Sequence, residues 1–312
     1  MANRTLVTGG AGFIGSHLVR GLLDAGHEVT VLDDLSSGFR DNLADIEGRI
    51  RFIQGSVLDD DSLEQSAQGA RCIFHLAAVA SVPQSVRDPI GTHRVNSEGT
   101  LRVLQEALKN ESRVILSSSS AVYGDGPELP KRETTPIEPT SPYAVQKLNS
   151  EDYLQMEQRL HGLEGFALRY FNVFGPRQNP ESEYAAVIPK FIVRALRGEA
   201  VTIFGDGKQT RDFIYVKDVV RANLLAMEAQ DADGTALNIG SGMVTDLNEL
   251  ARMVFSAVGG AEKVIHAPER EGDIKHSSCE AKLAKKRLGF EAQTTMAEGL
   301  METVDSYRTP VL

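Results

Sequence analysis

Tyr143 and Lys147 are the two side chains whose types and spacing point most directly to chemistry. They are four residues apart, so a helix would place the phenol and the ammonium on one face. Ser141 and Pro142 supply a helix start directly before them. A phenol with an ordinary pKa of about 10 is a poor base at neutral pH, but a nearby ammonium favours the phenolate. The pair predicts a tyrosine base assisted by a lysine; the alternative is two neighbours by chance on a solvated helix.

A run of four serines, Ser117–Ser120, lies at the end of an apolar stretch that begins at Val114. We expect this stretch to be a strand that ends at the mouth of a sheet, beside Tyr143. A serine hydroxyl there can donate to a substrate oxygen and relay a proton to the phenol. The alternative is a polar strand end whose hydroxyls satisfy backbone groups, which we expect of some of the four.

The stretch from Thr5 to Gly15 predicts the element that would hold a cofactor beside these side chains. Its apolar run breaks into glycines at three-residue spacing and resumes as a helix. Such a turn lets a pyrophosphate approach the backbone amides at the helix start. A second apolar run, Glu28–Asp33, ends in a carboxylate that can accept both hydroxyls of an adenosine ribose and would repel a 2′-phosphate. Together these features predict an NAD site, against the alternative of a glycine turn that binds nothing.

Strand-like and helix-like segments alternate through the first half of the chain. This alternation predicts an α/β fold, a Rossmann-type doubly wound parallel sheet whose strand ends converge on one ligand site. Further strands are expected at 50–54, 72–78, 114–117 and 166–170. We expect an NAD-binding domain over 1–170 with a return segment near 213–240. A smaller C-terminal α/β lobe that binds substrate is expected over 171–212 and 241–312.

Composition narrows the class of protein further. The 312-residue chain carries a net charge of −10, which argues against nucleic acid as a partner. No apolar stretch approaches the ~20 residues that span a bilayer, and the N-terminus shows no signal-peptide pattern, so we expect no membrane association. Cys72 and Cys279 are too few for a disulfide framework and form no metal motif, so reduced thiols in the cytoplasm are expected.

Six motifs in order, TGGAGFIG, HLAA, SSSSAVYG, SPYAVQK, RYFNVFGPRQ and GDGKQTRDFIYVKD, span nearly the whole chain. Together they resemble the extended short-chain dehydrogenase/reductase superfamily, also called the NAD-dependent epimerase/dehydratase family, and most closely its UDP-hexose 4-epimerases. The resemblance implies a catalytic trio of Ser119, Tyr143 and Lys147. It also implies that Lys147 bonds the nicotinamide ribose and that Asn96 helps to hold this lysine. The residues implied to bind the cofactor are Gly9, Gly12, Phe13, Ile14, Gly15, Asp33, Ser56, Val57, Leu76, Ala77, Ala78, Asn96, Tyr143, Lys147 and Tyr170.

The resemblance also implies a nucleotide-sugar site. Arg211 and Arg270 would clamp the diphosphate, because a guanidinium binds phosphate in a bidentate way that lysine cannot reproduce. The alternative for each arginine is a surface ion pair. The residues implied to bind substrate are Ser119, Asn172 at the diphosphate, Val187, Thr202 and Phe204 round the uracil, Arg211, Arg270, Asp273 on the uridine ribose, and Ser277.

The residues after Ser119 bear on the reaction. Sugar 4,6-dehydratases of the superfamily carry an acidic pair where this chain has Ser120 and Ala121, and related decarboxylases usually keep a Glu at the Ala121 position. Without these acids, assisted loss of water has no proton donor, and epimerisation is left. In the implied mechanism Tyr143 takes the 4-hydroxyl proton, C4 gives hydride to NAD⁺, and the 4-keto sugar turns over before hydride returns. NAD should then stay bound as a prosthetic group.

The residue at position 277 bears on the sugar. A bulky tyrosine there closes the pocket in many family members, whereas Ser277, preceded by His276, resembles the N-acetylhexosamine-accepting branch. We therefore expect interconversion of UDP-GlcNAc and UDP-GalNAc, with UDP-Glc and UDP-Gal also accepted. A UDP-glucuronate 4-epimerase stays open as an alternative, with Lys190 or Arg177 as the extra cation. A non-catalytic NAD sensor is disfavoured because such proteins typically lose the Tyr or the Lys.

Two departures from the family pattern concern Ser56 and Ala121. Ser56 stands where many relatives place an Asp near adenine, which would loosen NAD, and Ala121 replaces a common hydroxyl residue beside the substrate. The resemblance also implies a homodimer through helices around 92–108 and 143–160. Apolar spacing on these helices is equally explained by packing on the sheet; the residues are Leu101, Leu104, Leu108, Leu148, Tyr153 and Leu154.

Overall fold

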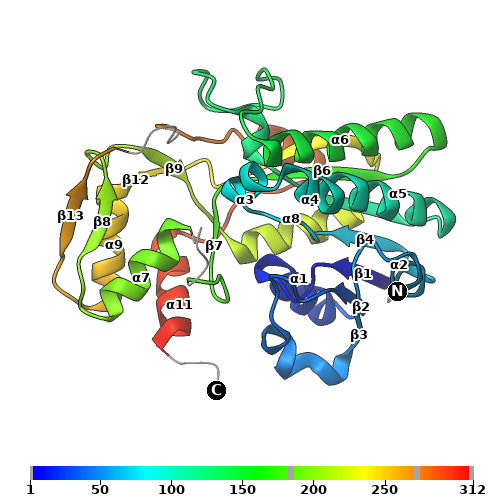
Figure 1. The fold of residues 1–312 in the computed structure, drawn as a ribbon, viewed down its shortest axis with the longest axis horizontal. Coiled ribbons are helices and arrows are strands. Elements are labelled where there is room, and N and C mark those ends of the chain that lie inside the picture. The colour runs from blue at the N-terminus through cyan, green and yellow to red at the C-terminus, as the bar shows by residue number, and fades with distance from the viewer. Residues whose placement is uncertain (1–2, 181–185, 270–274, 309–312) are drawn as a thin grey trace.

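A seven-stranded parallel sheet forms the centre of the larger lobe (Figure 1). The computed structural model describes residues 3–180, 186–269 and 275–308. The strand order β11-β6-β5-β4-β1-β2-β3 is that of a doubly wound Rossmann-type sheet, which confirms the expected fold class. The strands are β1 (Arg4–Thr8), β2 (Glu28–Asp33), β3 (Ile50–Gln54), β4 (Cys72–His75), β5 (Arg113–Ser119), β6 (Gly165–Tyr170) and β11 (Asp233–Ile239).

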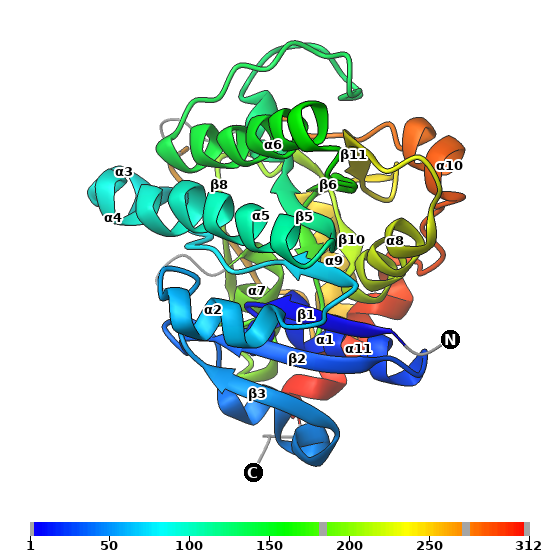
Figure 2. The ribbon, with the colours of Figure 1, turned by 90° about the vertical axis from the view of Figure 1, so that its right-hand side faces the viewer.

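Helices cover both faces of this sheet, as Figure 2 shows. Side chains alternate across the strands, so Leu6 and Leu116 enter one apolar cluster and Val7 and Ile115 enter the other. The first cluster is closed by α2 (Asp60–Ala67), α5 (Gly99–Lys109) and α6 (Pro142–His161). The second is closed by α1 (Phe13–Asp24), α8 (Val216–Glu228) and α10 (Lys282–Leu288). Helix α10 thus packs on the large sheet, although it lies within the stretch 241–312 that we expected in the smaller lobe.

The smaller lobe has its own apolar core, at the left of Figure 1. Strand β8 pairs in parallel with β13, and β9 pairs antiparallel with β12. Phe13 and Ile14 at the start of α1 pack against this core, so the two lobes meet where α1 begins. The elements are β7 (Val173–Phe174), α7 (Val187–Leu196), β8 (Val201–Phe204), β9 (Thr210–Asp212), β10 (Ile214–Tyr215), β12 (Val244–Asp246), α9 (Leu247–Val258), β13 (Val264–Ala267) and α11 (Met296–Arg308).

Short helices connect β4 to α5. They are α3 (Val82–Arg87), α4 (Pro89–His93) and a π-helical turn at Arg94–Glu98. Other short turns are 3-10 helices at Arg40–Arg49 and Ser120–Tyr123. In the described residues no helix is both long and apolar enough to cross a membrane.

A buried hydrogen-bond chain fastens α5 and α6 to the middle of the sheet. His75 at the end of β4 contacts Thr8 through Nδ1 (2.8 Å) and Thr100 of α5 through Nε2 (3.0 Å). The Thr100 hydroxyl is in turn 3.2 Å from the Ser150 hydroxyl in α6. All four side chains are buried. Because this chain crosses from β1 to α6, it fixes the helix that carries Tyr143 and Lys147.

We predict that His75 makes the fold sensitive to acid. Burial, with a smaller contribution from Lys147, lowers the pKa of His75 from 6.5 to about 3. The unfolded chain therefore takes up a proton below pH 6.5 that the folded chain refuses, so stability is lost as the pH falls from 6.5 toward 3. In His75→Gln this dependence is absent. Urea unfolding should show the stability gap between wild type and variant narrowing by about 2 kcal/mol from pH 7 to pH 5.

A stability gap between wild type and His75→Gln that stays constant from pH 7 to pH 5 would contradict the assignment of the acid sensitivity to His75.

Candidate active site

The predicted catalytic trio comes together where β5 ends and α6 begins. The phenol of Tyr143 is hydrogen-bonded to Ser119, at the last position of β5. Lys147, one turn along α6, donates from Nζ to the Ser117 carbonyl oxygen (2.8 Å), and its Nζ lies 6.0 Å from the centre of the Tyr143 ring. Ser141 caps α6 by accepting the Ala144 amide, which confirms the helix start expected from the sequence.

Burial governs the electrostatics of the trio. It raises the pKa of Tyr143, and the hydrogen bond from Ser119 only partly opposes this effect. It lowers the pKa of Lys147 from 10.5 to about 8, against an opposing contribution from the Glu151 carboxylate. Burial alone thus works against the expected phenolate. Formation of the phenolate therefore depends on positive charge brought by Lys147 and by a bound oxidised nicotinamide.

The three predicted glycines bring segments of backbone into close contact. Gly9 has φ +72°, and a Cβ added to it would lie 2.7 Å from the Ala77 amide nitrogen at the end of β4. A Cβ on Gly15 would lie only 2.1 Å from the Gly9 carbonyl oxygen. Gly12 donates its amide to the same carbonyl oxygen (3.2 Å). The glycine spacing is thus required for the strand-to-helix turn itself, whatever binds there.

The start of α1 suits a pyrophosphate. Gly12 occupies the N-cap position, so no capping side chain accepts the first amides, and the first turn contains no acidic residue. The amides of Phe13, Ile14 and Gly15 are among the donors that a helix leaves unpaired at its start, next to the positive end of its dipole. A pyrophosphate supplies the missing acceptors. The residues present therefore fit the diphosphate of a dinucleotide.

The carboxylate of Asp33 lies at the end of β2, as predicted. Its two oxygens accept the amides of Ala11 (2.8 Å) and Leu35 (2.9 Å). Burial raises the pKa of Asp33, while these two amides lower it. A carboxylate offers about four acceptor sites, so two remain for ribose hydroxyls.

The other predicted cofactor residues occupy the ends of the neighbouring strands. Ser56 follows β3 and accepts the Leu58 amide on its hydroxyl (3.2 Å). Val57 is buried against α5, where a Cβ on Gly99 would meet it at 2.7 Å. Three further predicted residues continue directly from β4, at the same edge of the sheet as Gly9: Leu76, Ala77 and Ala78.

Asn96 and Tyr170 both make side-chain hydrogen bonds inside the larger lobe. Asn96 is buried, but its amide donates to the Gln146 side chain (2.8 Å) and its oxygen accepts the Val79 amide (2.7 Å). It therefore acts on α6 next to Lys147 rather than on Lys147 itself. The Tyr170 hydroxyl lies in the core and donates to Asn223 Oδ1 (3.1 Å), so it is already used inside the larger lobe.

Three of the predicted substrate residues meet at β9: Asn172, Arg211 and Ser277. Asn172 donates to the Asp212 carbonyl oxygen (2.8 Å). Arg211 donates from Nη1 to the carbonyl oxygens of Thr210 (2.9 Å) and Lys275 (3.3 Å), and the Ser277 amide donates to Thr210 (3.0 Å). Arg211 and Ser277 are therefore joined through one backbone contact.

The residues predicted to pack round the uracil lie on β8 and at the start of α7. Thr202 and Phe204 alternate with the buried Val201 and Ile203, so they face away from the core of the smaller lobe. Val187, at the start of α7, is partly buried against that core. Arg270 and Asp273 lie outside the described residues.

Several residues of the site have no counterpart in the sequence-based prediction. The Ser85 hydroxyl accepts the Tyr143 amide (3.0 Å), and the buried Asp212 accepts the amides of Ser241 (2.8 Å) and Cys279 (3.2 Å) beside the Ser277 segment. These contacts join residues far apart in sequence, and no local spacing signals them. Glu151, four residues after Lys147, did carry such a signal, because it falls on the same helix face.

Comparison with known proteins agrees with this geometry. Residues 5–240 match the model of the NAD dependent epimerase/dehydratase family. The chain is 40% identical over 310 residues to a UDP-glucose 4-epimerase of Mycolicibacterium smegmatis, covering 98% of both. It is 35% identical over 319 residues to a UDP-N-acetyl-alpha-D-glucosaminuronate decarboxylase of Bacillus cytotoxicus, covering 99% of this chain and 98% of the relative.

A solved structure is similar over the same length. The UDP-N-acetylglucosamine 4-epimerase of Methanobrevibacter ruminantium, in complex with UDP-N-acetylmuramic acid, is 41% identical and superposes with a TM-score of 0.94, covering 98% of both chains. The matched family is NAD dependent, so the chain is an enzyme that uses NAD as its cofactor, and its seven-stranded sheet is the fold of such enzymes. The chain belongs to the NAD dependent epimerase/dehydratase family.

Proposed function

We propose that the chain is a 4-epimerase that interconverts UDP-GlcNAc and UDP-GalNAc and also accepts UDP-Glc and UDP-Gal. The family and its UDP-sugar epimerases support the reaction class. The observation that carries the proposal is the hydrogen-bonded pair Ser119–Tyr143 one helical turn from the Lys147 ammonium. The small side chain of Ser277, on the segment tied to Arg211, supports the acetylated sugar.

In this proposal each residue has a separate task. When bound, NAD supplies the acceptor and later the donor of a hydride at the sugar C4. Tyr143 holds the proton of the 4-hydroxyl, with Ser119 bridging phenol and sugar oxygen, and Lys147 supplies positive charge. Arg211 retains the diphosphate while the 4-keto sugar turns its other face to the cofactor. The 4-hydroxyl then reforms with inverted configuration.

The residue after Ser120 disfavours reactions in which the sugar loses water or carbon dioxide. Ala121 lies in the 3-10 turn Ser120–Tyr123 and donates its amide to the Ser119 hydroxyl (3.2 Å), so a methyl group stands beside the catalytic serine. A methyl group cannot supply or take a proton. This supports epimerisation over the decarboxylation named for the Bacillus relative.

A UDP-glucuronate 4-epimerase is the second candidate. Of the two cations considered for the uronate carboxylate, Lys190 is favoured over Arg177. Lys190 lies three residues after Val187 in α7 and so shares a helix face with it. Arg177 instead bonds Ser16 (3.1 Å) and His17 (2.9 Å) of α1. Assays with UDP-GlcNAc, UDP-Glc and UDP-glucuronate, resolved by NMR, separate the candidates, since a uronate enzyme would convert the third sugar and ignore the first two.

Removal of the phenol tests the mechanism. Tyr143→Phe should lower epimerisation by about 10²–10⁴-fold, because the sugar proton loses its acceptor. NMR measures the conversion of each UDP-sugar. The melting temperature and the NAD content of the purified variant serve as controls and should match the wild type. Persisting activity would overturn the mechanism, whereas activity that is absent from the wild type too would favour a non-catalytic NAD-binding protein.

Ser277 tests the sugar specificity. Ser277→Tyr should lower kcat/KM for UDP-GlcNAc by about tenfold or more relative to UDP-Glc, because the larger ring would fill the space for the N-acetyl group. Ser277→Ala keeps that space and should retain the wild-type ratio. An equal loss for both sugars in Ser277→Tyr would show that position 277 does not select the sugar.

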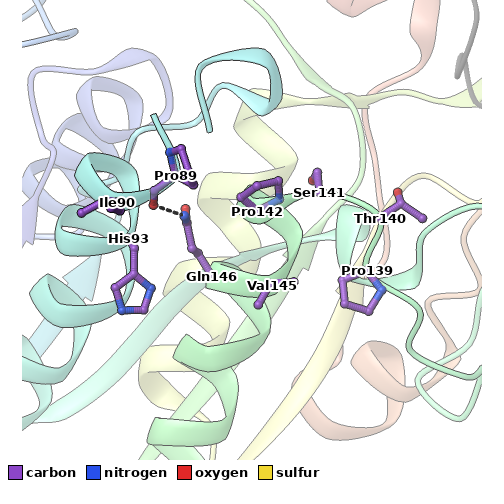
Figure 3. A pocket seen from close by; sticks show the side chains of 9 residues that line it. All are labelled: Pro89, Ile90, His93, Pro139, Thr140, Ser141, Pro142, Val145 and Gln146. Atoms are coloured by element: carbon purple, nitrogen blue, oxygen red, sulfur yellow. Dashed lines mark hydrogen bonds between the residues drawn. The ribbon is translucent and has the colours of Figure 1, made fainter. Parts of the chain in front are cut away.

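We also infer that the enzyme is a homodimer. Leu104 of α5 and Leu154 of α6 are buried against the sheet. Their apolar spacing is therefore explained by packing inside one chain and is no evidence for a dimer. Other apolar side chains remain exposed on α4 and α6: Ile90 is 72% and Val145 43% exposed. With Pro89 and Pro142 they line a hollow of about 520 Å³ between α4 and the start of α6 (Figure 3). A second copy would cover this surface.

The dimer prediction has a matched control. Val145→Asp should shift the mass measured by light scattering toward that of one chain, because a buried unpaired carboxylate opposes association. Met301→Asp adds the same charge at an exposed apolar position of α11, 59% exposed, and should leave the mass unchanged. A dimer that survives Val145→Asp would exclude this surface.

We also infer that the protein is located in the cytoplasm. Cys72 and Cys279 are both buried and free of disulfides. Burial raises the pKa of each thiol above its usual range, so neither is a reactive thiolate. Unpaired cysteines are typical of proteins kept in a reducing compartment.

A further inference from the structure

A buried ion pair lies directly behind the catalytic residues. Glu151 in α6 and Arg169 in β6 are 1% and 5% exposed. The guanidinium donates to both carboxylate oxygens, from Nε (2.9 Å) and from Nη2 (2.6 Å). Two charges are withdrawn from water at a substantial desolvation cost, so the pair is weak evidence for stability alone.

Glu151 continues the row of catalytic side chains on α6. Tyr143, Lys147 and Glu151 are spaced by four residues and therefore share one helix face. Each is joined to one of three consecutive residues at the end of β5. Tyr143 bonds Ser119, Lys147 donates to the Ser117 carbonyl oxygen, and Glu151 accepts the Ser118 hydroxyl.

Arg169 holds the carboxylate in place from the opposite side. Its remaining nitrogen, Nη1, donates to the Tyr123 hydroxyl (2.8 Å) and its guanidinium lies 4.9 Å from the Tyr123 ring centre. Tyr123 donates in turn to Asn238 (2.6 Å) in β11. Because every member of this network is buried and bonded, Glu151 has little freedom to turn away from α6 and β5.

The charges that face Lys147 come from three elements. On α6 these are the phenol of Tyr143 and the carboxylate of Glu151. On β4 the imidazole of His75 is uncharged at neutral pH, since burial lowers its pKa to about 3. On β6 Arg169 is paired to Glu151. Glu151 is therefore the negative charge that opposes the effect of burial on the Lys147 ammonium.

We propose that Glu151 is a positioning residue that keeps Lys147 cationic near neutral pH and the Ser117–Ser119 strand end in register, so that the ammonium still carries its charge when Tyr143 acts as a base. The inference rests on the proposed catalytic roles of Tyr143 and Lys147. Without the carboxylate, the buried ammonium loses its proton at a lower pH. The phenolate then forms only at higher pH, because it lacks its counter-charge.

The test removes the charge and retains the shape. In the NAD-loaded enzyme, the ultraviolet absorbance of tyrosinate is titrated, and each protein is compared with its own Tyr143→Phe version to isolate Tyr143. In Glu151→Gln the ionisation of Tyr143 should move upward by about one pH unit, a tenfold loss of phenolate below the midpoint. The kcat near neutral pH should fall about tenfold, while KM stays within about twofold.

Glu157→Gln is the matched control. Glu157 is also a buried carboxylate on α6, but it contacts Gln105 of α5 (2.6 Å) and not β5. Its substitution should leave the Tyr143 titration and the pH profile unchanged. Glu151→Asp keeps the charge and should restore part of the wild-type profile.

If Glu151→Gln does not fold, a second variant carries the same test. Glu151→Gln/Arg169→Leu removes both buried charges and so avoids an unpaired guanidinium. It should show the same upward shift of the Tyr143 titration. An unchanged titration in either folded variant would overturn the inference. Full activity of Tyr143→Phe would instead overturn the proposed function, so the two failures are distinguishable.

Discussion

The buried ammonium of Lys147 is the interaction on which the site depends. A cation in the middle of a protein is unfavourable unless acceptors and counter-charge surround it. The Ser117 carbonyl oxygen accepts it directly, and Glu151 faces it from one turn along α6. The neutral imidazole of His75 on β4 adds no competing positive charge. The end of β5, the face of α6 and the interior of β4 are therefore arranged round one group, and that group must be charged to assist the phenol of Tyr143.

The glycine turn serves two physical requirements at once. The close contact between Gly15 and the Gly9 carbonyl oxygen would be lost with any side chain, so the turn could not form. The same compact turn leaves α1 without a capping side chain and directs its first amides outward. Packing and anion binding thus demand the same residues. For this reason a glycine motif predicts the turn securely and a dinucleotide only together with the following strands and Asp33.

Local patterns predicted the parts of the molecule that local physics determines. The strand ends, the start of α6 at Ser141 and the pairing of Tyr143 with Lys147 all follow from periodicity and spacing. The ion-pair partner of Glu151 could not be predicted from local spacing. Arg169 comes from a different element, and the ion pair exists only once β6 packs against α6. Asn96 shows the same limit. Its bond to Gln146 depends on how the π-helical turn meets α6, and no local spacing signals that contact.

The smaller lobe illustrates why substrate residues are harder to predict than catalytic ones. Arg211 and Ser277 lie 66 positions apart in the sequence, yet both are tied to Thr210 and its neighbours. Asp212 in turn accepts the amide of Cys279, two residues after Ser277 (3.2 Å). Arg211, proposed to clamp the diphosphate, and Ser277, proposed to select the sugar, are therefore joined through backbone contacts. Under that proposal, sugar specificity in this lobe is a property of the joined segments and not of one side chain.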